Sequence, residues 1–135
     1  MINIKIYHYP KCSTSSTALA FLRSQNMEPE IILYCEIGLQ KTEILKLMDL
    51  LAISKPLDLI KRNGITYRNL GLAHKSLSDE ELIDVIIQNP KLIQRPIIIY
   101  NNKAIIGRNT EIIQNFYRNV ISSNVHHNSG NIFRT

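Results

Sequence analysis

Hydrophobic and polar residues alternate at the start of the chain, which is the period of a β-strand. Ile2, Ile4 and Ile6 share one face of that predicted strand. A helix is predicted to begin near Ser13, and its apolar face consists of Ala18, Leu19, Phe21 and Leu22. Residues 29–34, "PEIILY", form a second apolar run. The first third of the chain therefore predicts a strand, a helix and a second strand, with the two strands parallel.

The middle of the chain carries helical patterns. In residues 41–52 the apolar side chains recur at the spacing of an amphipathic helix, and they are Ile44, Leu47, Met48 and Leu51. A short helix is predicted over residues 56–62, because Pro56 suits a first helical turn. The segment "SLSDEELIDVIIQNP" gives the clearest helix: Ser78 and Glu81 form a capping box, and Pro90 ends it.

The last third returns to β-structure. Residues 95–107 contain two short β-rich runs around Asn101 and Asn102, which predicts a hairpin. A closing helix is predicted to begin at Asn109 or Thr110 and to bury Ile112, Ile113, Phe116 and Val120. The order predicts an α/β fold, a mixed sheet of the thioredoxin or glutaredoxin type with a helical insert between its two halves.

These elements also predict the domain organisation. Residues 1–121 are expected to form a single domain, with the helical insert at about residues 37–92. Residues 122–135 are polar and lack a hydrophobic period, which indicates a flexible tail.

Composition narrows the class of protein. The chain has 135 residues, 44% of them hydrophobic and 20% charged, as is typical of soluble globular proteins. It contains no apolar run of membrane-spanning length, and its start does not have the pattern of a secretory signal, so no membrane partner and a cytoplasmic location are expected. The net charge of +5 comes from scattered lysines and arginines, so nucleic-acid binding is not expected.

Cys12 is the outstanding candidate for chemistry. It lies in "YHYPKCSTSS", at the start of the first predicted helix, where unpaired backbone N–H groups and the helix dipole stabilise a thiolate. We therefore predict that Cys12 is a nucleophile. The same N–H groups and the neighbouring hydroxyls would hold an oxyanion. His8, four residues upstream, would lower the thiol pKa further if it were protonated.

The spacing around Cys12 excludes several alternative chemistries. Ser15 stands where a dithiol redox motif needs its second cysteine, and Ala18 stands where a phosphatase loop needs its arginine. No cluster of ligands has the spacing of a zinc site, so no metal is expected. Cys35 could resolve an oxidised Cys12, but we favour a packing role and assign it no chemistry.

Four segments, taken together, resemble a known family. "YHYPKCSTSSTAL", "RNGITYRNLGL", "SLSDEELIDVIIQNPKLIQRPIIIY" and "IIGRNTEII" are similar to the successive motifs of the glutaredoxin-coupled arsenate reductases. The similarity covers residues 3 to about 120. It implies that Cys12 attacks arsenate, and that glutathione and glutaredoxin then supply electrons that yield arsenite. It implies no tightly bound cofactor, with glutathione as a co-substrate.

The resemblance also assigns roles to side chains. It implies that His8 assists formation of the thiolate and that Ser15 lies in the anion-binding loop. Arg95 and Arg108 match the arginines that hold the oxyanion, a role that suits the forked guanidinium group. A resemblance to thioredoxin-like folds further implies a cis peptide bond before Pro96.

Two positions depart from the family pattern. Lys61 aligns with a third oxyanion-binding arginine, and Ser16 replaces an arginine that often follows the cysteine loop. One alternative function is therefore a glutathione-dependent monothiol oxidoreductase that acts on another substrate. The other is a regulator that resembles the Spx-type proteins and binds RNA polymerase, but Ser15 breaks the cysteine pair that those redox sensors commonly carry.

Overall fold

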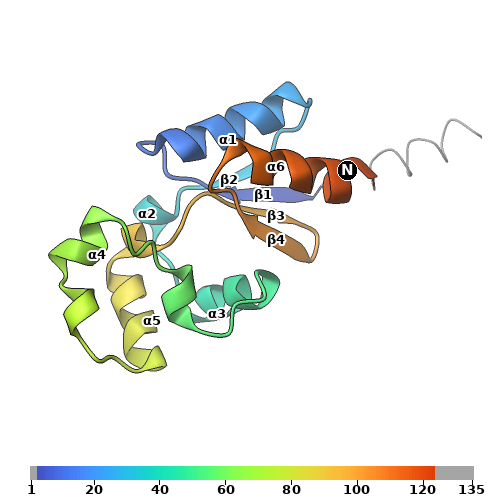
Figure 1. The fold of residues 1–135 in the computed structure, drawn as a ribbon. Coiled ribbons are helices and arrows are strands. Elements are labelled where there is room, and N and C mark those ends of the chain that lie inside the picture. Colours follow the sequence, from blue (N-terminus) through green and yellow to red (C-terminus); the bar gives the residue numbers. More distant parts are fainter. Residues whose placement is uncertain (1–2, 124–135) are drawn as a thin grey trace, which may run out of the picture.

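The structure, a computed structural model, describes residues 3–123. Its first half contains β1 (Ile4–Tyr7), α1 (Ser13–Ser24) and β2 (Glu30–Ile32). Between the two halves lie α2 (Tyr34–Ile37), α3 (Lys41–Leu50), η1 (Pro56–Leu59), α4 (Ile65–Asn69), η2 (Leu72–His74), α5 (Asp79–Gln88) and η3 (Pro90–Leu92). The second half contains β3 (Ile97–Tyr100), β4 (Lys103–Ile106), α6 (Thr110–Phe116) and the π-helical turn η4 (Tyr117–Ile121). Figure 1 shows these elements as a ribbon.

The strands form a four-stranded sheet in the order β2-β1-β3-β4. β1 pairs with β2 in parallel and with β3 antiparallel, and β3 and β4 form the antiparallel hairpin. The predicted mixed sheet, with helices inserted between its two halves, is therefore confirmed. Within the described residues, β4 is a terminal strand of this sheet.

Helices cover both faces of the sheet. In Figure 1, α1 and α6 lie on one face and the inserted helices lie toward the other. The side chains of β3 alternate between two hydrophobic clusters, because successive residues of a strand point to opposite faces. Ile98 packs in the cluster with α1 and α6, whereas Ile97 and Ile99 pack in the cluster with the insert. This explains why β3 is apolar throughout and buried on both faces.

Several predicted boundaries were wrong. The second strand ends at Ile32 rather than near residue 34, because Tyr34 begins α2. The helix expected over residues 56–62 is the short 3₁₀ turn η1. Ile112 and Val120 were expected to be buried, but both are only partly buried, and the fully buried residue near the end of the helix is Ile121. The π-helical turn η4 explains the shift from Val120 to Ile121, because its wider turn moves the inward position by one residue.

Other expectations lie outside the described residues or stay predictions. Ile2 and residues 124–135 are not described, and the backbone is still helical at Ser122 and Ser123. The single domain and the flexible tail therefore stay predictions. Among residues 3–123, no helix has both the length and the apolar character needed to cross a bilayer.

The predicted capping box of α5 is present and provides a test of local stability. The Ser78 hydroxyl accepts a hydrogen bond from the Glu81 backbone N–H (3.2 Å), and the Glu81 carboxylate accepts one from the Ser78 N–H (2.9 Å). Ser78→Ala should lower the free energy of unfolding by about 1 kcal/mol, because it removes the cap. Urea unfolding would measure this, with Ser76→Ala in the preceding loop as the matched control. Equal stabilities of the two variants would contradict the capping role.

Candidate active site

Cys12 is the N-cap residue of α1. Its backbone is extended (φ −98°, ψ 121°), and its carbonyl accepts the first helical hydrogen bond from the Ser16 N–H at 3.0 Å. The Cys12 N–H donates to the Tyr9 carbonyl at 2.9 Å, which closes the turn between β1 and α1. The cysteine therefore lies at the positive end of a 12-residue helix, as its sequence context predicted.

The surroundings of the thiol favour its ionised form. Burial by itself raises the pKa of Cys12, but hydrogen bonding to the Ser15 and Thr14 backbone and the hydrogen bond and charge of Arg95 outweigh it. The pKa of Cys12 is consequently below its ordinary value. Cys12 is only partly buried, so a substrate in solution can reach its thiolate.

His8 and Ser15 form a buried pair behind the cysteine loop. Nδ1 of His8 lies 2.7 Å from the Ser15 hydroxyl, which also accepts a hydrogen bond from the Tyr9 N–H at 3.1 Å. Both side chains are buried. Burial, and to a smaller extent the charge of Arg23, lower the pKa of His8, which favours the neutral form of its ring.

This geometry bears on the predicted roles of the pair. His8 is not among the groups that shift the pKa of Cys12, and its assistance to the thiolate stays a prediction. The Ser15 hydroxyl is hydrogen-bonded to His8 and to the Tyr9 N–H. The backbone of Ser15, by contrast, forms a hydrogen bond with the Cys12 thiol. His8 therefore contacts the cysteine loop through the Ser15 hydroxyl.

Arg95 is held beside the thiol by contacts on its other sides. Its Nη1 donates to the Lys91 carbonyl at 2.7 Å, and its Cζ lies 4.8 Å from the centre of the Tyr9 ring. Its buried Nε has no hydrogen-bond partner among the described residues. A guanidinium fixed in this way retains donors for an anion next to Cys12. The Arg95–Pro96 peptide bond is cis, as expected.

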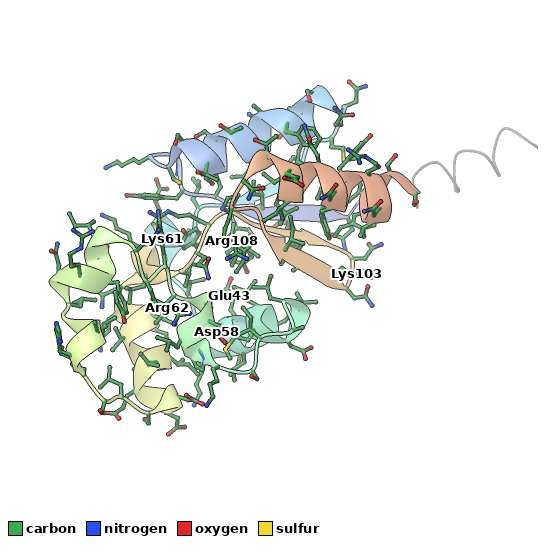
Figure 2. The ribbon with its side chains drawn as sticks, in the orientation of Figure 1. Glu43, Asp58, Lys61, Arg62, Lys103 and Arg108 are labelled. Atoms are coloured by element: carbon green, nitrogen blue, oxygen red, sulfur yellow. The ribbon has the colours of Figure 1, made fainter. Side chains whose placement is uncertain are left out.

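A pocket of about 510 Å³ opens at Cys12. It brings the thiol together with three predicted oxyanion-binding residues, Lys61, Arg95 and Arg108. Figure 2 shows Lys61 before α4 and Arg108 after β4, which come from segments far apart in the sequence. The lining contains cationic side chains and no acidic one. A concentration of positive charge around a thiol suits a small, multiply charged oxyanion.

The same pocket is also lined by Thr14, one of the hydroxyl residues predicted to hold the oxyanion. Its other lining residues were not predicted from the sequence, and they are Ile60, Arg62, Asn63 and Gln94. Arg62 and Asn63 directly follow Lys61, and Gln94 precedes Arg95, so chain adjacency was the available signal. Hydrophobic periodicity could not have identified these positions as pocket residues.

The remaining candidates lie elsewhere. Cys35 lines a separate hollow of about 250 Å³ with His8 and Tyr9, and burial raises the pKa of its thiol. Among residues 3–123, no group of three or more histidine, cysteine, aspartate or glutamate side chains is arranged to hold a metal ion. The two cysteines therefore differ in environment, and Cys12 is the one adapted for reactivity.

The lowered pKa of Cys12 predicts the pH dependence of its alkylation. Because the thiolate is the nucleophile, Cys12 should react with iodoacetamide at pH 6.5 several-fold faster than an ordinary thiol, as its titration midpoint lies lower. Arg95→Ala should move that midpoint to higher pH. Mass spectrometry resolves labelling at Cys12 from labelling at Cys35, which serves as the internal control. An unshifted midpoint for Cys12 would contradict the proposed activation.

Known proteins resemble this chain both in sequence and in structure. The sequence profile of the ArsC family matches residues 7–116. The uncharacterized protein YfgD of Escherichia coli (strain K12) is 40% identical over 108 residues, which cover 80% of this chain and 91% of that protein. An arsenate reductase of Escherichia coli is 39% identical over 113 residues, covering 84% of this chain and 79% of that enzyme. The solved structure of a putative arsenate reductase from Yersinia pestis has a TM-score of 0.78 and 33% identity, covering 83% of this chain and 98% of that one.

Proposed function

Because this chain belongs to the ArsC family, we propose that it is an arsenate reductase that uses Cys12 as its nucleophile. The observation that carries the proposal is the pocket, where a thiol of lowered pKa shares one cavity with Lys61, Arg95 and Arg108. A cationic cavity binds a tetrahedral oxyanion, and an adjacent thiolate can attack its central atom.

Binding of the substrate is the first step. Arsenate carries its charge on oxygens spread around arsenic, and guanidinium groups can contact two such oxygens at once. Arg95 belongs to the segment between η3 and β3, and Arg108 belongs to the segment that joins β4 to α6. Lys61 adds a point charge where the family pattern has an arginine.

Nucleophilic attack follows. The Cys12 thiolate forms a sulfur–arsenic bond, and one arsenate oxygen leaves as water after accepting protons. Arg95 and the backbone N–H groups at the start of α1 stabilise the negative charge that develops on the remaining oxygens. We propose that neutral His8 acts as a positioning residue, because it holds the Ser15 side chain and thereby the loop.

Reduction requires two electrons, which two thiols supply. Overall, one arsenic acid and two thiols give one arsenous acid, one disulfide and one water. Cys12 is the first thiol, and glutathione is the proposed second, because the pocket lining contains no other cysteine. Glutaredoxin is the proposed partner that reduces the resulting mixed disulfide and returns Cys12 to the thiol.

A second candidate function has one observation in its favour. Lys61 cannot make the forked contact of an arginine, so this position is less specialised for arsenate than the family pattern, although the neighbouring Arg62 also lines the pocket. The alternative is a glutathione-dependent oxidoreductase, in which Cys12 would attack a glutathionylated substrate. It uses the same nucleophile and requires fewer cationic contacts.

One coupled assay separates the two functions. NADPH oxidation is followed with glutathione, glutaredoxin and glutathione reductase, with either arsenate or a glutathionylated peptide as substrate. We expect arsenate-dependent oxidation well above that of a mixture without this protein. Because glutaredoxin itself reduces glutathionylated peptides, it is omitted from the peptide reactions. Peptide turnover above that of the mixture without this protein, with no arsenate-dependent oxidation, would favour the second function and overturn the first.

A further inference from the structure

A second hollow continues from the Cys12 pocket along β4. It has a volume of about 450 Å³ and shares Arg62, Gln94 and Arg108 with the pocket. We call this hollow the β4-edge groove. It leads away from Cys12 past half-buried apolar side chains, among them Leu51, Ile53 and Ile112.

The groove follows the edge of the sheet rather than one of its faces. It is lined by the consecutive residues Ala104, Ile105 and Ile106 of β4, whose side chains alternate between faces. A hollow that contacts all three must run beside the strand. Among the described residues β4 pairs with β3 alone, so alternate main-chain N–H and C=O groups face the groove. Such groups form hydrogen bonds with an added extended peptide.

The end of the groove nearest Cys12 is cationic. Arg62 and Arg108 line it there, and Arg62 lies 3.5 Å from Asp58 in a pair whose members are both about half exposed. Exposed pairs of this kind contribute little to stability, so a ligand carboxylate can take the place of Asp58 at low cost. In Figure 2, Asp58 and Arg62 come from the insert and Arg108 comes from the segment after β4.

The volumes of the pocket and the groove limit the size of the ligand that can bind there. Arsenate has few atoms and fills a small part of the 510 Å³ pocket, so space remains beside it. An extended tripeptide spans about 10 Å. The four residues of β4 span about 13 Å. The groove volume falls within the range of small-ligand sites.

From these features we infer that the β4-edge groove binds the reducing co-substrate, a free tripeptide thiol with carboxylate groups, of which glutathione is the example. The peptide main chain lies along β4, one carboxylate contacts Arg62 and Arg108, and the thiol points toward Cys12. This inference rests on the proposed function, because it explains how the second thiol reaches the arsenic bound to Cys12.

Binding can be tested without turnover. S-methylglutathione keeps both carboxylates but cannot act as a reductant. Titrated into the full-length ¹⁵N-labelled protein, it should shift the backbone amide signals of Ala104, Ile105 and Ile106. Arg62→Gln should weaken this binding about fivefold or more, whereas Arg118→Gln, an exposed arginine of η4, should leave it within twofold of the wild type. The diethyl ester of S-methylglutathione, which lacks the carboxylates, should bind similarly weakly.

The outcomes distinguish this inference from the proposed function. Shifts along β4 that depend on Arg62 and on the ligand carboxylates would support the groove. Shifts confined to the start of α1, or no binding at 20 mM ligand, would overturn it even if arsenate were reduced. Conversely, saturable binding along β4 without arsenate turnover would retain the groove and reject the arsenate assignment.

Discussion

Replacing Cys12 with serine should reduce arsenate turnover by about a thousandfold or more, because it removes the nucleophile. Serine is close to cysteine in size and is a favourable N-cap residue, but its hydroxyl is not ionised at neutral pH. The hydrogen bonds and the charge of Arg95 that lower the pKa of the Cys12 thiol would act on a far weaker acid in serine. The rate of NADPH oxidation in the coupled assay measures the effect.

Cys35→Ser is the matched control for this substitution. Cys35 lies outside the 510 Å³ pocket, and burial raises the pKa of its thiol. The variant should keep activity within twofold of the wild type. A comparable loss in both variants would contradict the account, because it would mean that Cys35 takes part in every turnover.

Replacing Arg95 with alanine should lower kcat/KM for arsenate by about a hundred- to a thousandfold, the usual effect of losing one preorganised donor to a developing oxyanion. Two losses combine in this variant. The oxyanion loses a guanidinium that the Lys91 carbonyl and the Tyr9 ring hold in place. The pKa of Cys12 also rises, because the hydrogen bond and charge of Arg95 help to lower it.

Two further variants show whether the effect of Arg95→Ala is local. Arg118→Ala removes the same charge from the exposed surface of η4 and should leave kcat/KM within twofold of the wild type. Arg95→Lys should restore the low pKa of Cys12 better than it restores kcat/KM, because lysine supplies charge without the fork. A loss below about threefold in Arg95→Ala would contradict direct contact with the oxyanion.

The parts of the fold that the sequence predicted correctly depend on local signals. The Ser78 capping box, the hairpin of β3 and β4 and the placement of Cys12 at the start of α1 each follow from a few neighbouring residues. The helix α4 carried no such signal, because none of its residues is buried and hydrophobic periodicity cannot reveal it. The π-helical turn η4 likewise has no pattern of its own.

In the candidate site, too, some residues were predictable from the sequence and others depend on tertiary packing. Cys12 was identified from its local context, and Arg95, Arg108 and Lys61 were placed with it by the family resemblance. Gln94 and Arg62 enter the pocket through tertiary packing, which brings the segment before α4 next to the segment before β3. The burial of His8 and its contact with Ser15 were also not predictable, because they depend on how the loop folds over the end of β1.

The most direct test of the central claim is to measure arsenite itself. The purified protein, glutathione and glutaredoxin would be incubated with arsenate, and both arsenic species would be separated by chromatography and quantified by mass spectrometry. We expect one arsenite for each disulfide formed, with no arsenite above background when Cys12→Ser replaces the wild type. Arsenite formation at an unchanged rate in Cys12→Ser, or none in the wild type, would contradict the assignment of this pocket to arsenate reduction.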